Sequence, residues 1–89
     1  MRAVITVIGK DMVGILAKVS TVCADKKVNV LEVTQSILQD LFVMVMMVDI
    51  SGSSVPFSEL VGDLDSLGDS LNLKIHTMHE DIFNAMHRI

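Results

Sequence analysis

Two segments of this 89-residue chain would be apolar on both faces if each formed a β-strand. A strand directs alternate side chains to opposite faces of its sheet, so a strand with one solvent-facing side alternates apolar and polar residues. Residues 3–8 and 41–50 lack that alternation. In the first, Val4, Ile5, Val7 and Ile8 leave no clear polar face, and in the second Val43, Val45 and Met47 alternate with Phe42, Met44, Met46 and Val48. Both segments are therefore predicted to be central strands.

The other segments have one polar side each. Residues 29–38 and 73–78 alternate apolar and polar side chains, which is typical of edge strands. Apolar residues recur at helical spacing over residues 13–26 and 56–72, which predicts two amphipathic helices. A shorter apolar stripe predicts a third helix over residues 80–89.

The order strand, helix, strand, strand, helix, strand predicts an α+β fold. We expect a ferredoxin-like βαββαβ arrangement with an antiparallel four-stranded sheet in the order 4-1-3-2. Right-handed crossovers would place the two main helices on one face, followed by the short C-terminal helix. The second sheet face would then need cover from that helix or from another protomer, and the adaptable side chains of Met44, Met46 and Met47 suit either.

Composition narrows the class of protein. We expect a single domain over residues 1–89, and an apolar content of 51% is high for so short a chain, which indicates an apolar interface. A net charge of −4 with three aromatic residues argues against direct nucleic-acid binding. Cys23, the single cysteine, is expected to be buried, and its presence suits a reducing compartment. The apolar runs are too short to span a membrane. A cytoplasmic protein is predicted.

The turn after the first strand is suited to a small polar ligand. The first backbone N–H groups of a helix lack intrahelical acceptors, so the amides of about Met12 to Leu16 could bind a carboxylate. Asp11 could bind an amine, and the two together would suit an α-amino acid. Alternatively, Asp11 only caps the helix and Gly14 only permits close packing.

Catalytic and metal chemistry have no support in the sequence. His76 and His79 are three residues apart on or next to a strand, so their side chains tend to opposite faces and would not share a metal. There is neither a nucleophile paired with a base nor a phosphate-binding loop. We therefore expect a non-enzymatic protein without a metal or cofactor.

The pattern Gly9-x-Asp11-x-x-Gly14-Ile15-Leu16, followed by Val28-Asn29-Val30, resembles the ACT domain, the amino-acid-sensing module of metabolic regulators. The chain is most similar to small free-standing bacterial ACT proteins and, more loosely, to the glycine-cleavage repressor type. The resemblance implies a ligand between the first loop of one subunit and the second strand of its neighbour. The candidate ligand-binding residues are then Asp11, Met12, Val13, Gly14, Ile15, Asn29 and Val30.

One position departs from the family pattern. Lys27 stands where many members have glycine, so it must accept about 1 to 2 kcal/mol of left-handed backbone strain or the helix must end differently.

Two functions remain open. The favoured one is an allosteric regulatory module that senses a small molecule, an amino acid by resemblance, and acts as a homodimer or higher oligomer on a separate, unidentified protein of amino-acid metabolism. The alternative is a purely structural assembly domain that binds no ligand.

Overall fold

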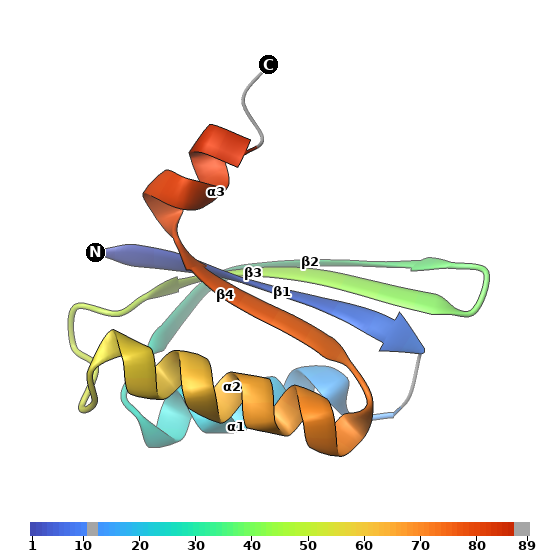
Figure 1. Cartoon of the computed structure of the whole chain (residues 1–89), viewed down its shortest axis with the longest axis horizontal. Helices are drawn as coiled ribbons and strands as arrows, with labels where there is room; N and C mark the ends of the chain where they lie inside the picture. Colours follow the sequence, from blue (N-terminus) through green and yellow to red (C-terminus); the bar gives the residue numbers. More distant parts are fainter. Residues whose placement is uncertain (11–12, 87–89) are drawn as a thin grey trace.

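The computed structural model describes residues 1–10 and 13–86. Its elements are β1 (Arg2–Lys10), α1 (Ile15–Asp25), β2 (Asn29–Leu38), β3 (Leu41–Asp49), α2 (Phe57–Leu71), β4 (Lys74–His79) and α3 (Glu80–Met86). The four strands form one antiparallel sheet in the order β2-β3-β1-β4, and Figure 1 shows α1 and α2 together below it. This confirms the predicted ferredoxin-like fold and its strand order. None of the described helices has the length and hydropathy to cross a membrane.

The two apolar strands lie at the centre of the sheet, as predicted. Ile5 of β1 is paired with Met46 of β3 on one side and with Thr77 of β4 on the other. Met44 and Met46 are fully buried on the side that faces the helices. From the sequence, we expect Met44, Met46 and Met47 to adapt to whatever covers the second sheet face, but the strand register leaves only Met47 of these three on that face.

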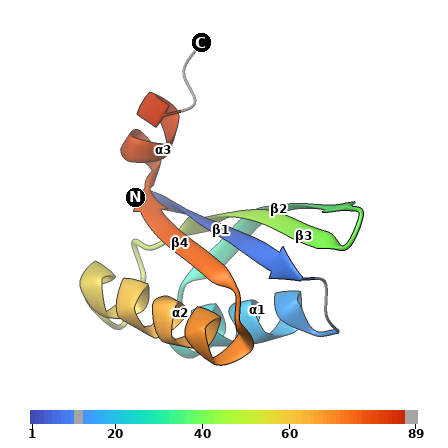
Figure 2. The same ribbon diagram turned by 45° about the vertical axis from the view of Figure 1, so that its right-hand side comes forward.

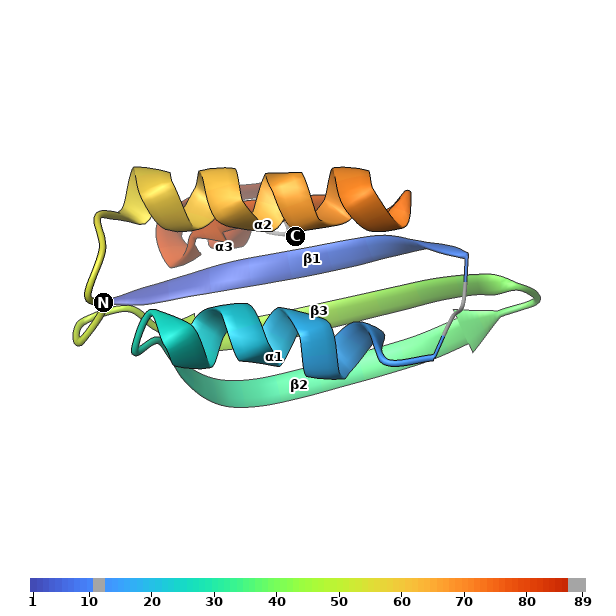
Figure 3. The same ribbon diagram turned by 90° about the horizontal axis from the view of Figure 1, so that it is seen from below.

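The helices cover one side of the sheet through regularly spaced apolar residues. In α1 the buried residues are Ile15, Val19 and Cys23, and in α2 they are Leu60, Leu64 and Gly68, four residues apart in each case. Figures 2 and 3 show α1 and α2 side by side on this face. Nζ of Lys26 lies 2.9 Å from Oδ2 of Asp63 and joins the end of α1 to α2. This hydrogen bond is the main cause of a raised pKa for Lys26.

The end of α1 is closed by Lys27 in the left-handed conformation, with φ of 59°. The backbone N–H of Val28 donates to the carbonyl oxygen of Cys23 at 2.8 Å, and that of Lys27 donates to Ala24 at 3.1 Å. These two bonds form a Schellman motif, in which the left-handed position is usually glycine. Lys27 therefore accepts the strain rather than ending the helix another way.

α3 follows β4 directly and rises from the sheet on the side opposite α1 and α2 (Figure 1). It contacts β1 and β4, but none of its residues is buried, and Ile82 and Met86 are 54% and 66% exposed. The C-terminal helix thus covers only part of the second sheet face. The reason is its length, since seven residues make about two turns.

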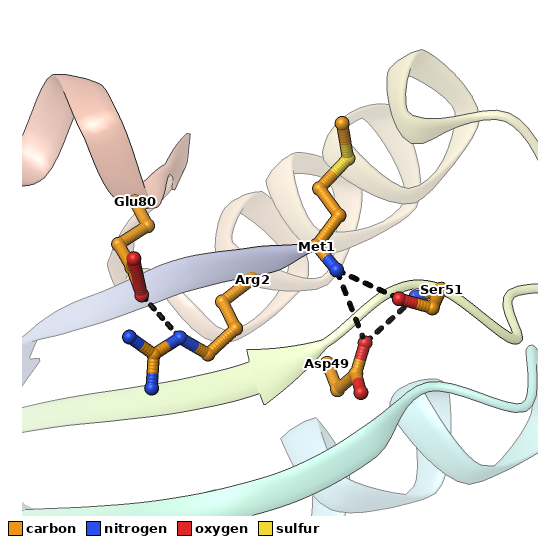
Figure 4. A network of polar contacts seen from close by, with 5 residues as sticks. All are labelled: Met1, Arg2, Asp49, Ser51 and Glu80. Atoms are coloured by element: carbon orange, nitrogen blue, oxygen red, sulfur yellow. Dashed lines mark hydrogen bonds and ion pairs between the residues drawn. The ribbon is translucent and has the colours of Figure 1, made fainter.

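A polar network lies where β1 begins (Figure 4). The amino group of Met1 donates to Oγ of Ser51 at 2.7 Å and lies 3.7 Å from the carboxylate of Asp49. The backbone N–H of Ser51 donates to the same carboxylate at 2.9 Å and is the main cause of its lowered pKa. Next to it, the guanidinium of Arg2 forms an ion pair with Glu80, the first residue of α3.

Candidate ligand site

Five of the seven predicted site residues follow β1 in the sequence and end at Ile15, the first residue of α1. Asp11 and Met12 lie outside the described residues. Val13 is 97% exposed, and Gly14 has a left-handed backbone with φ of 86° and is the N-cap of α1. Because Gly14 is the N-cap, helix α1 begins at Ile15, two residues later than the sequence predicted, and the N-cap position weighed for Asp11 belongs to Gly14.

The later start of α1 changes which amides face the turn. The carbonyl oxygen of Gly14 accepts the N–H of Lys18 at 3.0 Å, which is the first bond of the helix. The N–H groups of Ile15, Leu16 and Ala17 therefore have no acceptor within the helix and form the positive end of its dipole. Of the predicted amides, those of Ile15 and Leu16 lie within this first turn, whereas those of Val13 and Gly14 precede it.

Asn29 and Val30, the other predicted pair, lie at the opposite end of α1. An 11-residue helix is about 16 Å long, and the chain leaves that helix through Lys27 before it enters β2. Asn29 is exposed and is paired with Asp49, whereas Val30 packs partly against the core. A single chain therefore does not bring this pair next to Gly14 and Ile15.

The edge of the sheet beside α1 exposes an apolar strip that the sequence analysis did not assign to the site. Val33 and Ile37 of β2 are 36% and 56% exposed on the helix side of the sheet, and Leu16 of α1 is 37% exposed. β2 has one sheet neighbour, β3, so its other edge is unpaired within the described chain. The alternating pattern of residues 29–38 was the available signal, since it placed these side chains on one face.

The two histidines lie on opposite faces of β4. His76 is paired with Thr6 on the face away from α1 and α2, whereas the ring of His79 packs edge-on against Phe57, with centroids 6.1 Å apart. Nδ1 of His79 is 4.0 Å from the carboxylate of Asp81. Among residues 1–10 and 13–86, no three His, Cys, Asp or Glu side chains are grouped as metal ligands would be.

Comparison with known proteins gives consistent matches in sequence. The sequence model of the ACT domain matches residues 2–78. A UPF0237 protein of Clostridium acetobutylicum is 46% identical over 89 residues, which is the full length of both chains. A UPF0237 protein of Methanocaldococcus jannaschii is 44% identical over 88 residues, covering 99% of this chain and 98% of the relative.

Solved structures give the same result. An ACT domain protein from Streptococcus pneumoniae superposes with a TM-score of 0.81 at 37% identity, over 98% of both chains. A protein described as a glycine cleavage system transcriptional repressor superposes with a TM-score of 0.73 at 21% identity, over 89% of this chain and 47% of the other. The regulatory subunit of aspartate kinase from Thermus thermophilus gives 0.65 at 22% identity, over 85% and 49%. The last two matches, at low identity, concern the fold alone.

Proposed function

Because this chain belongs to the ACT domain family, whose members are typically ligand-binding regulatory modules, we propose that it senses an α-amino acid bound between two copies of itself. The signal would pass to a separate protein of amino-acid metabolism.

The candidate site residues form two groups, one at the start of α1 and one at the start of β2. The distance between these two groups supports the proposal most directly. Gly14 and Ile15 begin α1, and Asn29 follows its end, so the two groups are about one helix length apart in one chain. A twofold axis that pairs β2 with β2 of a second copy in antiparallel fashion reverses α1 relative to its partner. Each Ile15 would then lie near the neighbour's Asn29, which completes two equivalent sites per dimer.

The chemistry of the combined site suits a zwitterion. The amides of Ile15 and Leu16, at the positive end of α1, would donate to the ligand carboxylate. The carboxylate of Asp11 would bind the ammonium group, and the amide side chain of Asn29 from the neighbouring subunit would supply a further hydrogen bond. A ligand that contacts both subunits strengthens their association, and this linkage would make the module a sensor.

The alternative, an assembly domain without a ligand, is supported by the apolar strip of Leu16, Val33 and Ile37. Such a strip is buried on dimer formation whether or not an amino acid is present. The two functions differ only in whether the turn before α1 has an occupant.

A thermal-shift screen with the common amino acids separates the two functions. A ligand at a hundredfold excess over its dissociation constant adds about 2.7 kcal/mol to the stability of a folded state that alone binds it. For a chain of this length we expect an increase in Tm of roughly 10 to 20 °C with one amino acid or a small group of them. No shift with any amino acid would favour the assembly domain.

Variants then test the assigned residues. Asp11→Ala and Asn29→Ala should each weaken binding of the amino acid found in the screen at least tenfold, because each removes a polar contact to a charged ligand, worth roughly 1.5 to 3 kcal/mol. Asp65→Ala is the matched control, since it removes an exposed carboxylate from α2. An Asp11→Ala protein that binds as tightly as the wild type would refute the role of this residue.

A further inference from the structure

The sheet has a second unpaired edge, that of β4. β4 has one sheet neighbour, β1, so within the described chain the backbone N–H and C=O groups that point to its other edge have no strand partner. In Figure 1, β4 is the strand nearest the viewer, with α2 below it and α3 above it. Backbone groups at such an edge can pair with an extended segment of another protein.

Two aspartates of α2, Asp65 and Asp69, lie beside the β4 edge. Asp63 of the same helix faces α1, where it pairs with Lys26. Because successive residues of a helix are about 100° apart around its axis, Asp65 and Asp69 lie on the side of α2 away from α1. They share a hollow of about 280 Å³ with the start of β4, and its lining residues are Asp65, Asp69, Leu73, Lys74, Ile75 and His76.

Both carboxylates are available to a cation from outside the chain. Asp65 and Asp69 are exposed, and neither forms an ion pair with any residue in the ranges 1–10 and 13–86. The β4 edge therefore combines unpaired backbone groups with two uncompensated negative charges on the helix side of the sheet.

We propose that the β4 edge binds an extended segment of another protein that has lysine or arginine at two alternate positions. The segment would add a fifth strand next to β4, and its two basic side chains, both on the helix side, would pair with Asp65 and Asp69. The identity of its owner rests on the proposed function, in which the segment belongs to the separate protein that the module regulates. The binding itself does not require an amino acid, and it uses the sheet edge opposite β2.

The spacing of the two carboxylates fits a strand. Residues four apart on a helix have Cβ atoms about 5 to 6 Å apart, and alternate residues of a strand are about 7 Å apart. Only Asn72 and Leu73 separate α2 from β4, so the chain reverses there and the helix runs back alongside the strand. Each basic side chain of the added strand would thus reach one carboxylate.

Charge argues against a second copy of this chain as the occupant. Two β4 edges paired around a twofold axis would place the α2 helices of both copies side by side, with Asp65 and Asp69 of one near those of the other. Four carboxylates in one row repel each other, and the net charge of −4 on each copy adds to that repulsion. A segment with two basic side chains neutralises the same carboxylates.

The first test measures the binding of labelled, capped heptapeptides by fluorescence anisotropy at low ionic strength. One peptide has lysine at positions 3 and 5 and threonine elsewhere, and the other has glutamate in place of both lysines. The wild type should bind the lysine peptide saturably and at least tenfold more tightly than the glutamate peptide, because only lysine attracts the carboxylates of α2.

The double variant Asp65→Lys with Asp69→Lys should reverse this preference. Glu32→Lys with Asp40→Lys is the matched control, since it changes the net charge equally at exposed positions of β2 and its hairpin, and it should still prefer the lysine peptide. Circular dichroism checks the fold of both double variants.

The second test examines backbone pairing and needs only the wild type. N-methylation removes an N–H donor, and successive N–H groups of a strand point to opposite edges. The lysine peptide is therefore methylated either at the amides of positions 3 and 5 or at those of positions 4 and 6. One form should lose affinity at least tenfold, and the other should keep most of it.

Three results would overturn the proposal. They are no binding of the lysine peptide to the wild type at about 1 mM, an unchanged preference in a folded Asp65→Lys and Asp69→Lys variant, and equal affinity of the two methylated peptides. The thermal-shift screen with amino acids reports separately on the turn before α1, so either proposal can fail alone.

Discussion

Lys27 occupies a backbone position that ordinarily belongs to glycine. Its φ of 59° places Cβ close to the following carbonyl group, which costs an L-residue about 1 to 2 kcal/mol. The two hydrogen bonds that close α1 and the burial of Val28 hold the residue there. Gly14, at the other end of α1, adopts φ of 86° without such a cost.

We expect Lys27→Gly to raise the free energy of unfolding by about 1 kcal/mol, because it relieves this strain. Lys27→Ala is the control, since it removes the charge but keeps Cβ and should give no comparable gain. Urea denaturation of both variants measures the difference. A glycine variant no more stable than the alanine variant would contradict the strain argument.

At the scale of the elements, α2 has two glycines in different surroundings. A Cβ built on Gly62 meets nothing within 4 Å, whereas a Cβ on Gly68 would lie 2.9 Å from the carbonyl oxygen of Leu73 and 3.1 Å from Cγ1 of Ile75. Gly68 therefore permits the close approach of α2 to β4, and Gly62 only adds freedom to the unfolded chain.

The two alanine variants should change stability in opposite directions. Gly62→Ala should stabilise the protein by about 0.5 to 1 kcal/mol through helix propensity. Gly68→Ala should destabilise it by about 1 to 3 kcal/mol, since its methyl group forces the helix away from β4. Thermal unfolding of both variants tests this, and destabilisation of equal size in both would show that the space around Gly68 is irrelevant.

The strand order could be predicted from the sequence because a strand that is buried on both faces lacks the usual alternation of apolar and polar residues. Residues 3–8 and 41–50 have no polar side, and only the centre of a sheet accommodates such strands. Helix ends were less predictable. The N-cap of α1 depends on the left-handed backbone of Gly14, which a pattern of apolar residues does not report.

The candidate site was only partly predictable for a geometric reason. A sequence motif identifies residues such as Gly14 and Asn29 but does not give the distance between them in space. That distance is set by the length and direction of α1. The position of α3 could not be predicted either. An apolar stripe such as that of Ile82 and Met86 indicates that the helix packs against something, but not which surface it packs against.

At the scale of the whole molecule, Cys23 is a probe of global unfolding. Its side chain is fully buried between α1 and the sheet, and burial raises the pKa of its thiol. The thiolate is the reactive form, so both effects protect it. We expect labelling by a neutral-pH thiol reagent to be slower than in the unfolded chain by about 5,000-fold or more, the factor that corresponds to about 5 kcal/mol of stability.

The labelling rate in dilute urea should rise in step with the unfolded fraction measured by circular dichroism. Complete labelling within the mixing time in the absence of denaturant would mean that α1 opens without the rest of the molecule.

The central place of β1 determines when the protein can fold. β1 is the first strand made, yet one of its neighbours, β4, is the last, and their pairing joins Ala3 to His79. Closing a loop of that length costs conformational entropy before any contact is gained, which slows folding. During synthesis, β1 must therefore wait with one edge unpaired until β4 has left the ribosome, so the nascent chain is exposed to aggregation for most of its translation.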